Sequence, residues 1–177
     1  GWPSVAESTI IARDVELAQF TGSRYHACHI STAESVEVIR WAKKRGKADI
    51  TAEVTPHHLL LDTPHVESFD TTYKVNPPLR TNEHIEALRE ALVDGTIDIV
   101  GTDHAPHTQE DKDHPFDVAS PGMLGLEAAL AVVMELFVNT GRMDWATVVD
   151  RMSAAPARIG RLPHQGRPLA VGEPANL

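Results

Sequence analysis

Gly101-Thr102-Asp103-His104-Ala105-Pro106-His107 is the stretch that decides the fold, because it places a carboxylate and two imidazoles directly after an apolar run. Residues 96–100 read as a short buried strand, which the glycine ends. In a barrel of parallel strands, catalytic groups and metal ligands collect at the C-terminal strand ends. Asp103 lies four residues beyond Ile99, so strand alternation predicts that both share the inward face. Such an aspartate can bind a metal and accept a proton; a helix N-cap is the alternative.

Composition narrows the classes of partner. The 177-residue chain carries a formal net charge of −9 and is long enough for one ordinary domain. The acidic balance, without a cluster of Lys or Arg, argues against nucleic acid and anionic membrane surfaces as partners. No apolar run approaches the ~20 residues that a membrane span needs. Cys28 is the only cysteine, so an intrachain disulfide is excluded and a cytoplasmic protein is expected.

Strand and helix patterns alternate along the chain, which predicts repeated βα units and a parallel sheet. We expect strands at 24–29, 48–54 and 98–101, and helices at 10–20, 31–46, 83–93, 123–138 and 144–149. Ser31 and Glu34 have capping-box spacing, Thr81 is a further expected cap, and Pro156 should interrupt the last helical pattern. The polar segment 108–121 is long for a connection and is therefore a candidate active-site loop.

Three strand–helix units are fewer than the eight strands and ~250 residues of a complete (β/α)8 barrel. The expected fold is therefore α/β, a partial (β/α)8 TIM-type barrel. A barrel does not close on three strands, so two sheet edges should stay open. We expect the chain to be a fragment of a longer protein, and to be marginally stable or aggregation-prone alone.

His29 ends the first expected strand, where a neutral imidazole is either a good zinc ligand or a structural hydrogen-bond donor. Alternation places His29 on the face opposite His26 and Cys28, and Cys28 is interpreted as a small core hydrophobe. The adjacent pair His57 and His58 is expected on an extended segment, with a supporting or packing role rather than metal binding.

Residues 73–80, Tyr-Lys-Val-Asn-Pro-Pro-Leu-Arg, form a loop whose two prolines restrict the backbone so that one side chain is presented accurately. Asn76 offers one acceptor and two donors, which match the edge of a cyclic amide or imide; an Asn-Pro turn without ligand is the alternative. At Pro121 and Gly122, backbone groups can come close to a ligand because glycine permits close approach.

Five strings in order resemble the C-terminal half of a dihydroorotase of the bacterial class I type, in the amidohydrolase superfamily. They are His29-Ile-Ser-Thr-Ala-Glu-Ser, Thr51-Ala-Glu-Val-Thr-Pro-His-His-Leu-Leu-Leu, Lys74-Val-Asn-Pro-Pro-Leu-Arg, Gly101-Thr-Asp-His-Ala-Pro-His and Pro121-Gly-Met-Leu-Gly-Leu-Glu. The resemblance covers the whole chain. It implies that residues 1–160 are the C-terminal strand–helix units of a (β/α)8 barrel. Residues 161–177 would begin the return to a small flanking β-domain, with a new strand starting near residue 174.

The resemblance implies zinc-dependent, reversible cyclisation of N-carbamoyl-L-aspartate to L-dihydroorotate in pyrimidine biosynthesis, with two zinc ions in the intact site. His29 matches a ligand of one ion; Asp103 matches a ligand of the other and the catalytic acid/base. Asn76 and His107 match substrate-contacting positions, as do Pro121 and Gly122 through their backbone. The family's remaining ligands lie upstream of these segments. The isolated chain is therefore expected to be inactive, because two ligands do not hold a catalytic metal centre.

Two other functions stay open. A hydantoinase or allantoinase would act on a related cyclic amide, although residues 76–80 and the Pro56-His57-His58 triplet favour dihydroorotase. An inactive homologue would instead be a structural partner of aspartate transcarbamoylase, although the presence of both His29 and Asp103 argues for the active form. The expected partners are a small-molecule substrate and either a second copy of the protein or aspartate transcarbamoylase.

Overall fold

The computed structural model describes residues 2–174 and contains a parallel sheet with the strand order β1-β2-β3. Strand β1 (Tyr25–Ala27) pairs with β2 (Ile50–Val54), and β2 pairs with β3 (Ile99–Val100). The three strands lie inside the predicted ranges and helical segments separate them, so the chain is α/β as the alternation predicted.

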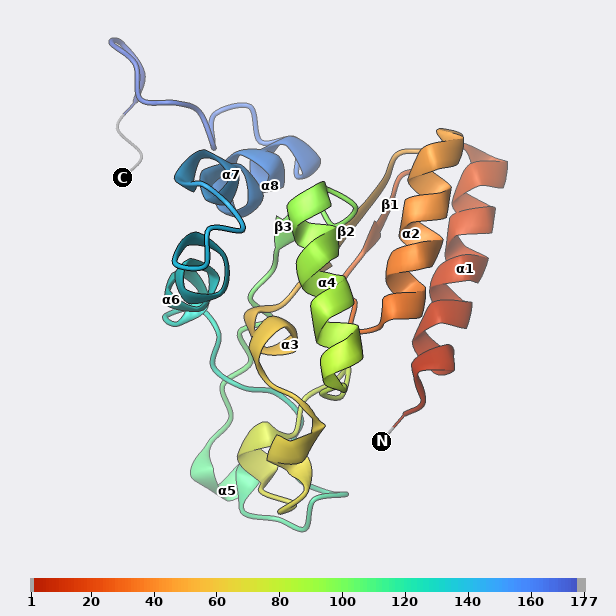
Figure 1. Ribbon diagram of the computed structural model, residues 1–177, viewed down its shortest axis with the longest axis vertical. Helices are drawn as coiled ribbons and strands as arrows, with labels where there is room; N and C mark the ends of the chain where they lie inside the picture. The colour runs from red at the N-terminus through yellow and green to blue at the C-terminus, as the bar shows by residue number, and fades with distance from the viewer. Residues whose placement is uncertain (1, 175–177) are drawn as a thin grey trace.

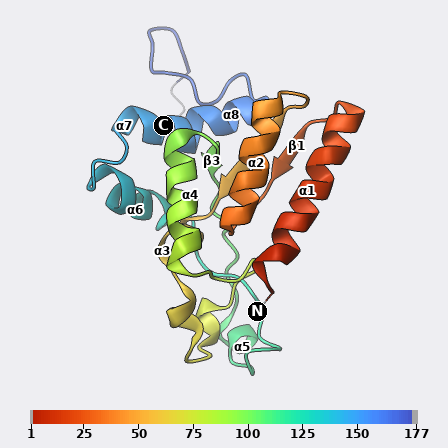
Figure 2. The same cartoon turned by 45° about the vertical axis from the view of Figure 1, so that its right-hand side comes forward.

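Helices α1 (Ser4–Thr21), α2 (Ala33–Arg45) and α4 (Asn82–Asp94) lie along the sheet in Figures 1 and 2. Alternate residues of β2, Ile50, Ala52 and Val54, are buried and belong to the hydrophobic core that these helices share. The intervening residues Thr51 and Glu53 point to the opposite face, because successive side chains of a strand alternate. One face of the sheet is therefore apolar and covered, while the other carries polar side chains.

The helix ends explain where the predictions succeed and fail. Gly22, Gly46 and Gly95 end helices α1, α2 and α4 with left-handed backbone, as their positions suggested. The start of α2 differs from the prediction, because Thr32 rather than Ser31 accepts the capping bond, from the backbone N–H of Ser35. Thr81 precedes α4 but makes no side-chain capping bond.

The second half of the chain is more broken than its apolar pattern indicated. The expected helix 123–138 begins only at α6 (Ala129–Val133) and continues as a π-helical turn, η3 (Met134–Val138). Met123 instead forms a β-bridge with His104, and the chain from Met123 to the start of α6 is therefore not part of the helix. Pro156 does not end the last helix: it lies at the start of α8 (Ala155–Ile159), directly after α7 (Trp145–Val149) and the π-helical turn η4 (Asp150–Ala154).

The C-terminal ends of the strands face a layer of loops, seen at the lower end of Figures 1 and 2. This layer contains α3 (Pro56–Leu60), η1 (Thr63–Val66), η2 (Thr71–Tyr73) and α5 (Gln109–Lys112). The ammonium group of Lys112 donates to the carbonyl oxygens of Thr71, Lys74 and Ser120, at 3.0, 3.3 and 2.9 Å. The segment 108–121 is thereby attached to the loop that contains Asn76.

Two expectations concern the end of the chain and membranes. Residues 161–174 form turns without a strand, and residues 175–177, where part of a new strand was expected, lie outside the described residues. The start of a flanking β-domain therefore stays a prediction. Within residues 2–174, no helix is both long and apolar enough to cross a membrane.

A carboxylate joins helix α1 to the start of α2. Glu7 accepts hydrogen bonds from the backbone N–H of Ser31 at 2.9 Å and from the hydroxyls of Ser31, Thr32 and Ser35. The guanidinium of Arg80, itself buried, lies 3.8 Å from Glu7 and donates to the Ser31 hydroxyl at 3.1 Å. Two helices and the loop that ends at Arg80 therefore meet at this acid.

Replacing Glu7 by Gln should lower the free energy of unfolding by about 1–3 kcal/mol, because one acceptor oxygen becomes a donor among donors. Thermal and urea denaturation of the full-length protein would measure the loss. Glu16→Gln is the matched control, since Glu16 is exposed and makes only a surface ion pair with Arg45. Equal stability of the two variants would contradict a structural role for Glu7.

Candidate functional site

His29 and Asp103 follow the two outer strands of the sheet, β1 and β3, and their side chains approach each other. The Nε2 atom of His29 lies 3.5 Å from Oδ1 of Asp103. Both residues have left-handed backbone, with φ of 53° and 46°. A non-glycine residue in this region costs about 1–3 kcal/mol, and such strain gathers at functional sites. The side chains of His29 and Asp103 are therefore close enough to flank one metal centre, as their interpretation as metal ligands requires.

Glu53, on the central strand β2, connects the site residues. Its Oε1 lies 2.7 Å from Nδ1 of His29, and its Oε2 lies 3.1 Å from Nε2 of His26. The other nitrogen of His26 is 2.7 Å from the hydroxyl of Thr51. The His29 contact is short, but its geometry is not that of an aligned hydrogen bond.

These contacts shift the pKa values of the group. Burial alone would raise the pKa of Glu53, but its close contacts with the imidazoles of His26 and His29 outweigh burial and lower the pKa to about 2. The contact with the Glu53 carboxylate raises the pKa of His29, although burial opposes this. Glu53 is therefore a carboxylate that stays ionised between two imidazoles.

Strand alternation misplaced two residues near His29. Strand β1 ends at Ala27, and the left-handed backbone at His29 turns the chain, so alternation does not extend to this residue. His26 and His29 consequently contact the same carboxylate instead of facing apart. The interpretation of Cys28 as a core residue was wrong, because its side chain is exposed. Ligand atoms of His26, Cys28 and Glu53 lie within 4.8 Å of one another.

Glu53 is the functional candidate that the sequence reasoning missed. Its signal was a charged residue between buried apolar residues of a short strand, on the same face as Thr51. Gly101 carries a second signal: a Cβ atom at this position would lie 2.5 Å from the carboxylate oxygen of Glu53. The glycine that follows β3 therefore leaves the space that the Glu53 carboxylate occupies.

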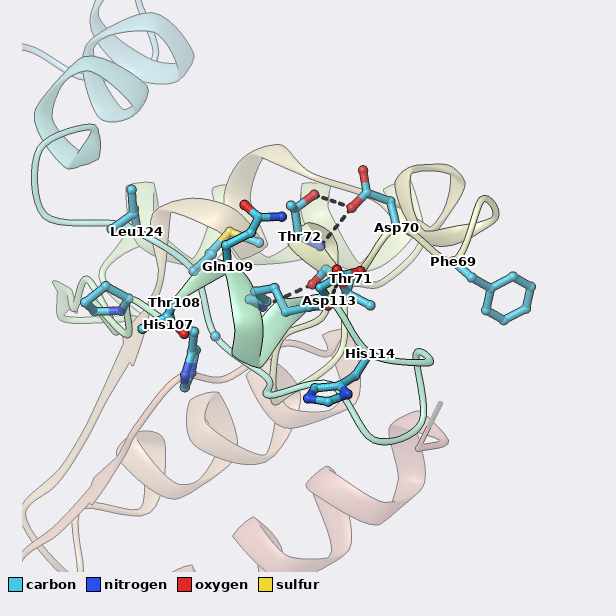
Figure 3. Close-up of a pocket in the computed structure, with 14 residues that line it drawn as sticks. Phe69, Asp70, Thr71, Thr72, His107, Thr108, Gln109, Asp113, His114 and Leu124 are labelled. Carbon is cyan, nitrogen blue, oxygen red and sulfur yellow. Dashed lines mark hydrogen bonds between the residues drawn. The ribbon is translucent and has the colours of Figure 1, made fainter.

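The predicted substrate-contacting residues are divided between two cavities. His107 and Gly122 line a cavity of about 630 Å³ beside α5, shown in Figure 3 with His107 and Leu124 on one side and Phe69 pointing away. Asn76 and Pro121 line a second cavity of about 890 Å³. The linings described for these cavities include neither His29 nor Asp103. Neither of these cavities therefore brings the substrate candidates into one pocket with the His29–Asp103 pair.

Close packing joins the two cavities at residues 121–122. The ring of His107 lies with Nε2 3.0 Å from the carbonyl oxygen of Pro121. Gly122 has φ of 139°, and a Cβ atom there would come within 2.9 Å of His107 Nε2 and within 2.8 Å of the Ala105 side chain. Its backbone N–H donates to the carbonyl oxygen of Lys74 at 2.8 Å. Glycine is needed here because no side chain fits.

His57 and His58 lie in helix α3 rather than on an extended segment, and both are buried. His58 supports the Asn76 loop: its Nε2 is 2.9 Å from the carbonyl oxygen of Pro77, and its Nδ1 is 2.7 Å from the hydroxyl of Thr55. The two ring nitrogens of His57 have no hydrogen-bond partner among the described residues. Burial lowers the pKa of His57 to about 3 and that of His58 to about 4.

His29 and Asp103 provide part of the ligand set that a metal ion such as zinc needs. An imidazole nitrogen and a carboxylate oxygen 3.5 Å apart suit ligands of one ion, or of two adjacent ions, with bonds of about 2.0–2.2 Å. Both side chains are partly exposed, so an ion could reach them. A catalytic zinc site usually has three protein ligands, and His29 and Asp103 supply two.

Comparison with curated proteins gives consistent relatives. The chain is 63% identical over all 177 residues to a protein named dihydroorotase from Streptomyces coelicolor, and covers 41% of it. It is 61% identical to the protein of that name from Leifsonia xyli, and 55% identical to that from Mycobacterium tuberculosis, again over its whole length. The chain spans about two fifths of the length of these relatives. No family model matches the chain.

Solved structures with the same arrangement include proteins named hydantoinase or dihydropyrimidinase. An L-hydantoinase (dihydropyrimidinase) from Arthrobacter aurescens superposes with a TM-score of 0.89 at 34% identity, over 98% of this chain and 39% of that one. A D-hydantoinase (dihydropyrimidinase) from Thermus sp. gives a TM-score of 0.90 at 30% identity, with the same coverage. The arrangement of strands and helices is thus shared with enzymes less similar in sequence than the dihydroorotases.

The buried histidines predict how stability depends on pH. Their pKa values are lowered from 6.5 in the folded state, so the unfolded chain binds more protons between about pH 6.5 and pH 4. The contribution of these two histidines to stability should be complete above pH 6.5, and it should fall by up to about 1.4 kcal/mol for each histidine per unit that the pH decreases. His57→Leu removes one of these terms without breaking a hydrogen bond described for His57.

Urea denaturation of the full-length protein at pH 7.5 and pH 5 would measure this effect. Between pH 7.5 and pH 5, the free energy of unfolding of His57→Leu should fall by about 1–2 kcal/mol less than that of the unmodified protein. The same substitution at His114, whose side chain is exposed, serves as the control and should change the pH dependence little. Parallel losses in the His57 variant and the unmodified protein would show that His57 is not held neutral.

Proposed function

Because this chain is a homologue of dihydroorotases along its whole length, we propose that the protein containing it interconverts N-carbamoyl-L-aspartate and L-dihydroorotate with zinc, in pyrimidine biosynthesis. The observation that carries the proposal is the approach of His29 and Asp103 to 3.5 Å at the C-terminal ends of parallel strands. Its support from sequence is the 55–63% identity to proteins named dihydroorotase.

The proposal includes a partial (β/α)8 barrel. The sheet of strands β1 to β3 has β1 and β3 as its edges among the described residues, so further strands can add on both sides. We infer that the rest of the protein supplies them. The polar face of the sheet, with Thr51 and Glu53, would then point into the barrel, and His29 and Asp103 would stand at its mouth.

His29 would hold one zinc ion and Asp103 another, with the remaining ligands supplied by the rest of the protein. When bound, zinc would polarise the amide carbonyl and make water more acidic. The residues of this chain have two tasks beside this chemistry. They hold the ions and the substrate in place, and they move one proton.

Asp103 would be the group that moves the proton. In the hydrolytic direction, water adds to the ring carbonyl, Asp103 takes a proton from that water, and the carbon–nitrogen bond breaks as Asp103 protonates the ring nitrogen. In the biosynthetic direction the same carboxyl group takes the proton from the carbamoyl nitrogen and gives it to the departing water. His107 would lie near the substrate carboxylate, Asn76 near the ring amide, and Pro121 and Gly122 would offer backbone groups.

Two alternatives make different predictions. Hydantoinases share the fold but are less similar in sequence, at 30–34% identity against 55–63% for the dihydroorotases. An inactive partner of aspartate transcarbamoylase would bind that enzyme without turning over a cyclic amide. Assays of the full-length protein with dihydroorotate, hydantoin and allantoin would separate these functions.

Asp103→Asn in the full-length protein should lower turnover by about 10²–10⁴-fold in both directions, because the amide side chain does not carry the proton. Assays of dihydroorotate hydrolysis and of its synthesis would measure the loss. Asp49→Asn makes the same chemical change at an exposed ion pair with Arg24 and should leave turnover unchanged. Near-normal activity of Asp103→Asn would exclude the acid/base assignment.

The isolated 177-residue chain should have no dihydroorotase activity, because it offers two of the protein ligands that a catalytic zinc site needs. The purified chain, assayed with dihydroorotate and excess zinc beside the full-length protein, would test this. Measurable turnover by the chain alone would show that it contains a complete site.

A further inference from the structure

The Nδ1 atom of His29 is buried and makes no aligned hydrogen bond among the described residues. Glu53 Oε1, at 2.7 Å, is the carboxylate oxygen in contact with it. The Nε2 atom of the same ring points toward Asp103, 3.5 Å away. A neutral imidazole that gives one nitrogen to a metal keeps a proton on the other, and that N–H needs an acceptor. The arrangement assigns the metal-facing role to Nε2 and leaves Nδ1 to Glu53.

Glu53 is itself held firmly. It lies in the central strand β2, and its side chain is only 12% exposed. Its second oxygen contacts His26 at 3.1 Å, and Thr51 fixes the other side of the His26 ring at 2.7 Å. Gly101 leaves the space for the carboxylate, because a Cβ atom there would collide with it. Strands β1, β2 and β3 therefore all contribute to the position of this acid.

We propose that Glu53 is a positioning residue of the metal site, which accepts the Nδ1 proton of His29 and keeps Nε2 unprotonated and directed toward Asp103. Thr51 contacts His26, and His26 contacts Glu53, so a chain of contacts from Thr51 to His29 holds the acid in place. This inference rests on the proposed function, because it takes His29 to be a metal ligand. Carboxylate acceptors of this kind orient metal-binding histidines, and their loss weakens metal binding by about 10–100-fold.

Glu53 has an alternative role, in which its carboxylate binds a metal ion directly. His26, Cys28 and Glu53 place ligand atoms within 4.8 Å of one another, a spacing that a metal could use. The geometry favours positioning, because both oxygens of Glu53 already contact imidazoles at 2.7 and 3.1 Å. Cys28 distinguishes the two roles, because it would be a ligand together with Glu53 but has no part in positioning His29.

The test uses the full-length protein and measures zinc affinity by competition with a chromophoric chelator. Glu53→Gln should bind zinc about 10–100-fold more weakly than the unmodified protein, because the uncharged amide holds the Nδ1 proton less well. The visible spectrum of the Co²⁺-loaded protein should also change, which a general loss of stability would not cause. Glu67→Gln is the matched control, since Glu67 is exposed and should leave affinity and spectrum unchanged.

Two further variants make the test decisive. His26→Gln should also weaken zinc binding, but less than Glu53→Gln does. If circular dichroism shows that Glu53→Gln is unfolded, His26→Gln takes its place in the test. Cys28→Ser should leave both zinc affinity and the number of ions bound unchanged. Unaltered affinity in folded Glu53→Gln or His26→Gln would overturn the proposal. So would a loss in Cys28→Ser as large as that in Glu53→Gln, because the acid would then be a ligand.

Failure of the proposed function has a separate signature. A full-length protein that binds zinc but does not turn over dihydroorotate would refute dihydroorotase activity, while the zinc affinity of Glu53→Gln would still decide the positioning role. A full-length protein that binds no zinc or cobalt would overturn both.

Discussion

The contact between the Glu53 carboxylate and the imidazoles of His26 and His29 is the interaction on which the rest of the site depends. It joins β1 to β2 on the polar face of the sheet. A carboxylate that is largely removed from water is costly without partners, and here each oxygen of Glu53 contacts an imidazole nitrogen. Gly101, directly after β3, completes the arrangement by having no side chain.

A second set of contacts fixes the loops around these strand ends. His58 holds the carbonyl of Pro77, and Arg80 reaches both Ser31 and the carbonyl oxygen of Trp2. Lys112 joins the segment 108–121 to the Asn76 loop through three carbonyl oxygens. Loops without regular structure are normally mobile, but side chains that satisfy their backbone groups restrict them. The Asn76 loop is therefore a supported surface beside the sheet.

The sequence predicted the local features of this molecule well. Apolar periodicity and glycines located α2, α4 and the C-terminal end of α1, because these signals depend on neighbours three or four residues away. The start of α1 was predicted wrongly, since the helix begins at Ser4 and not near residue 10. The sequence failed where contacts distant in sequence decide the conformation. Helix α6 begins late because Met123 pairs with His104, and the inward or outward direction of His29 follows a left-handed turn rather than the strand repeat. Glu53 was overlooked because its partners lie on other segments.

The order of motifs alone determined the family resemblance, the α/β class and the choice of His29 and Asp103 as a pair. These follow from residue types and their spacing, which the chain carries whatever its conformation. Only the tertiary structure decided that a third group, Glu53, lies beside His29, that Cys28 is exposed, and that the substrate candidates are divided between two cavities. The physical reason is that contacts between parallel strands join residues more than 20 positions apart, and no local periodicity encodes which side chains then meet.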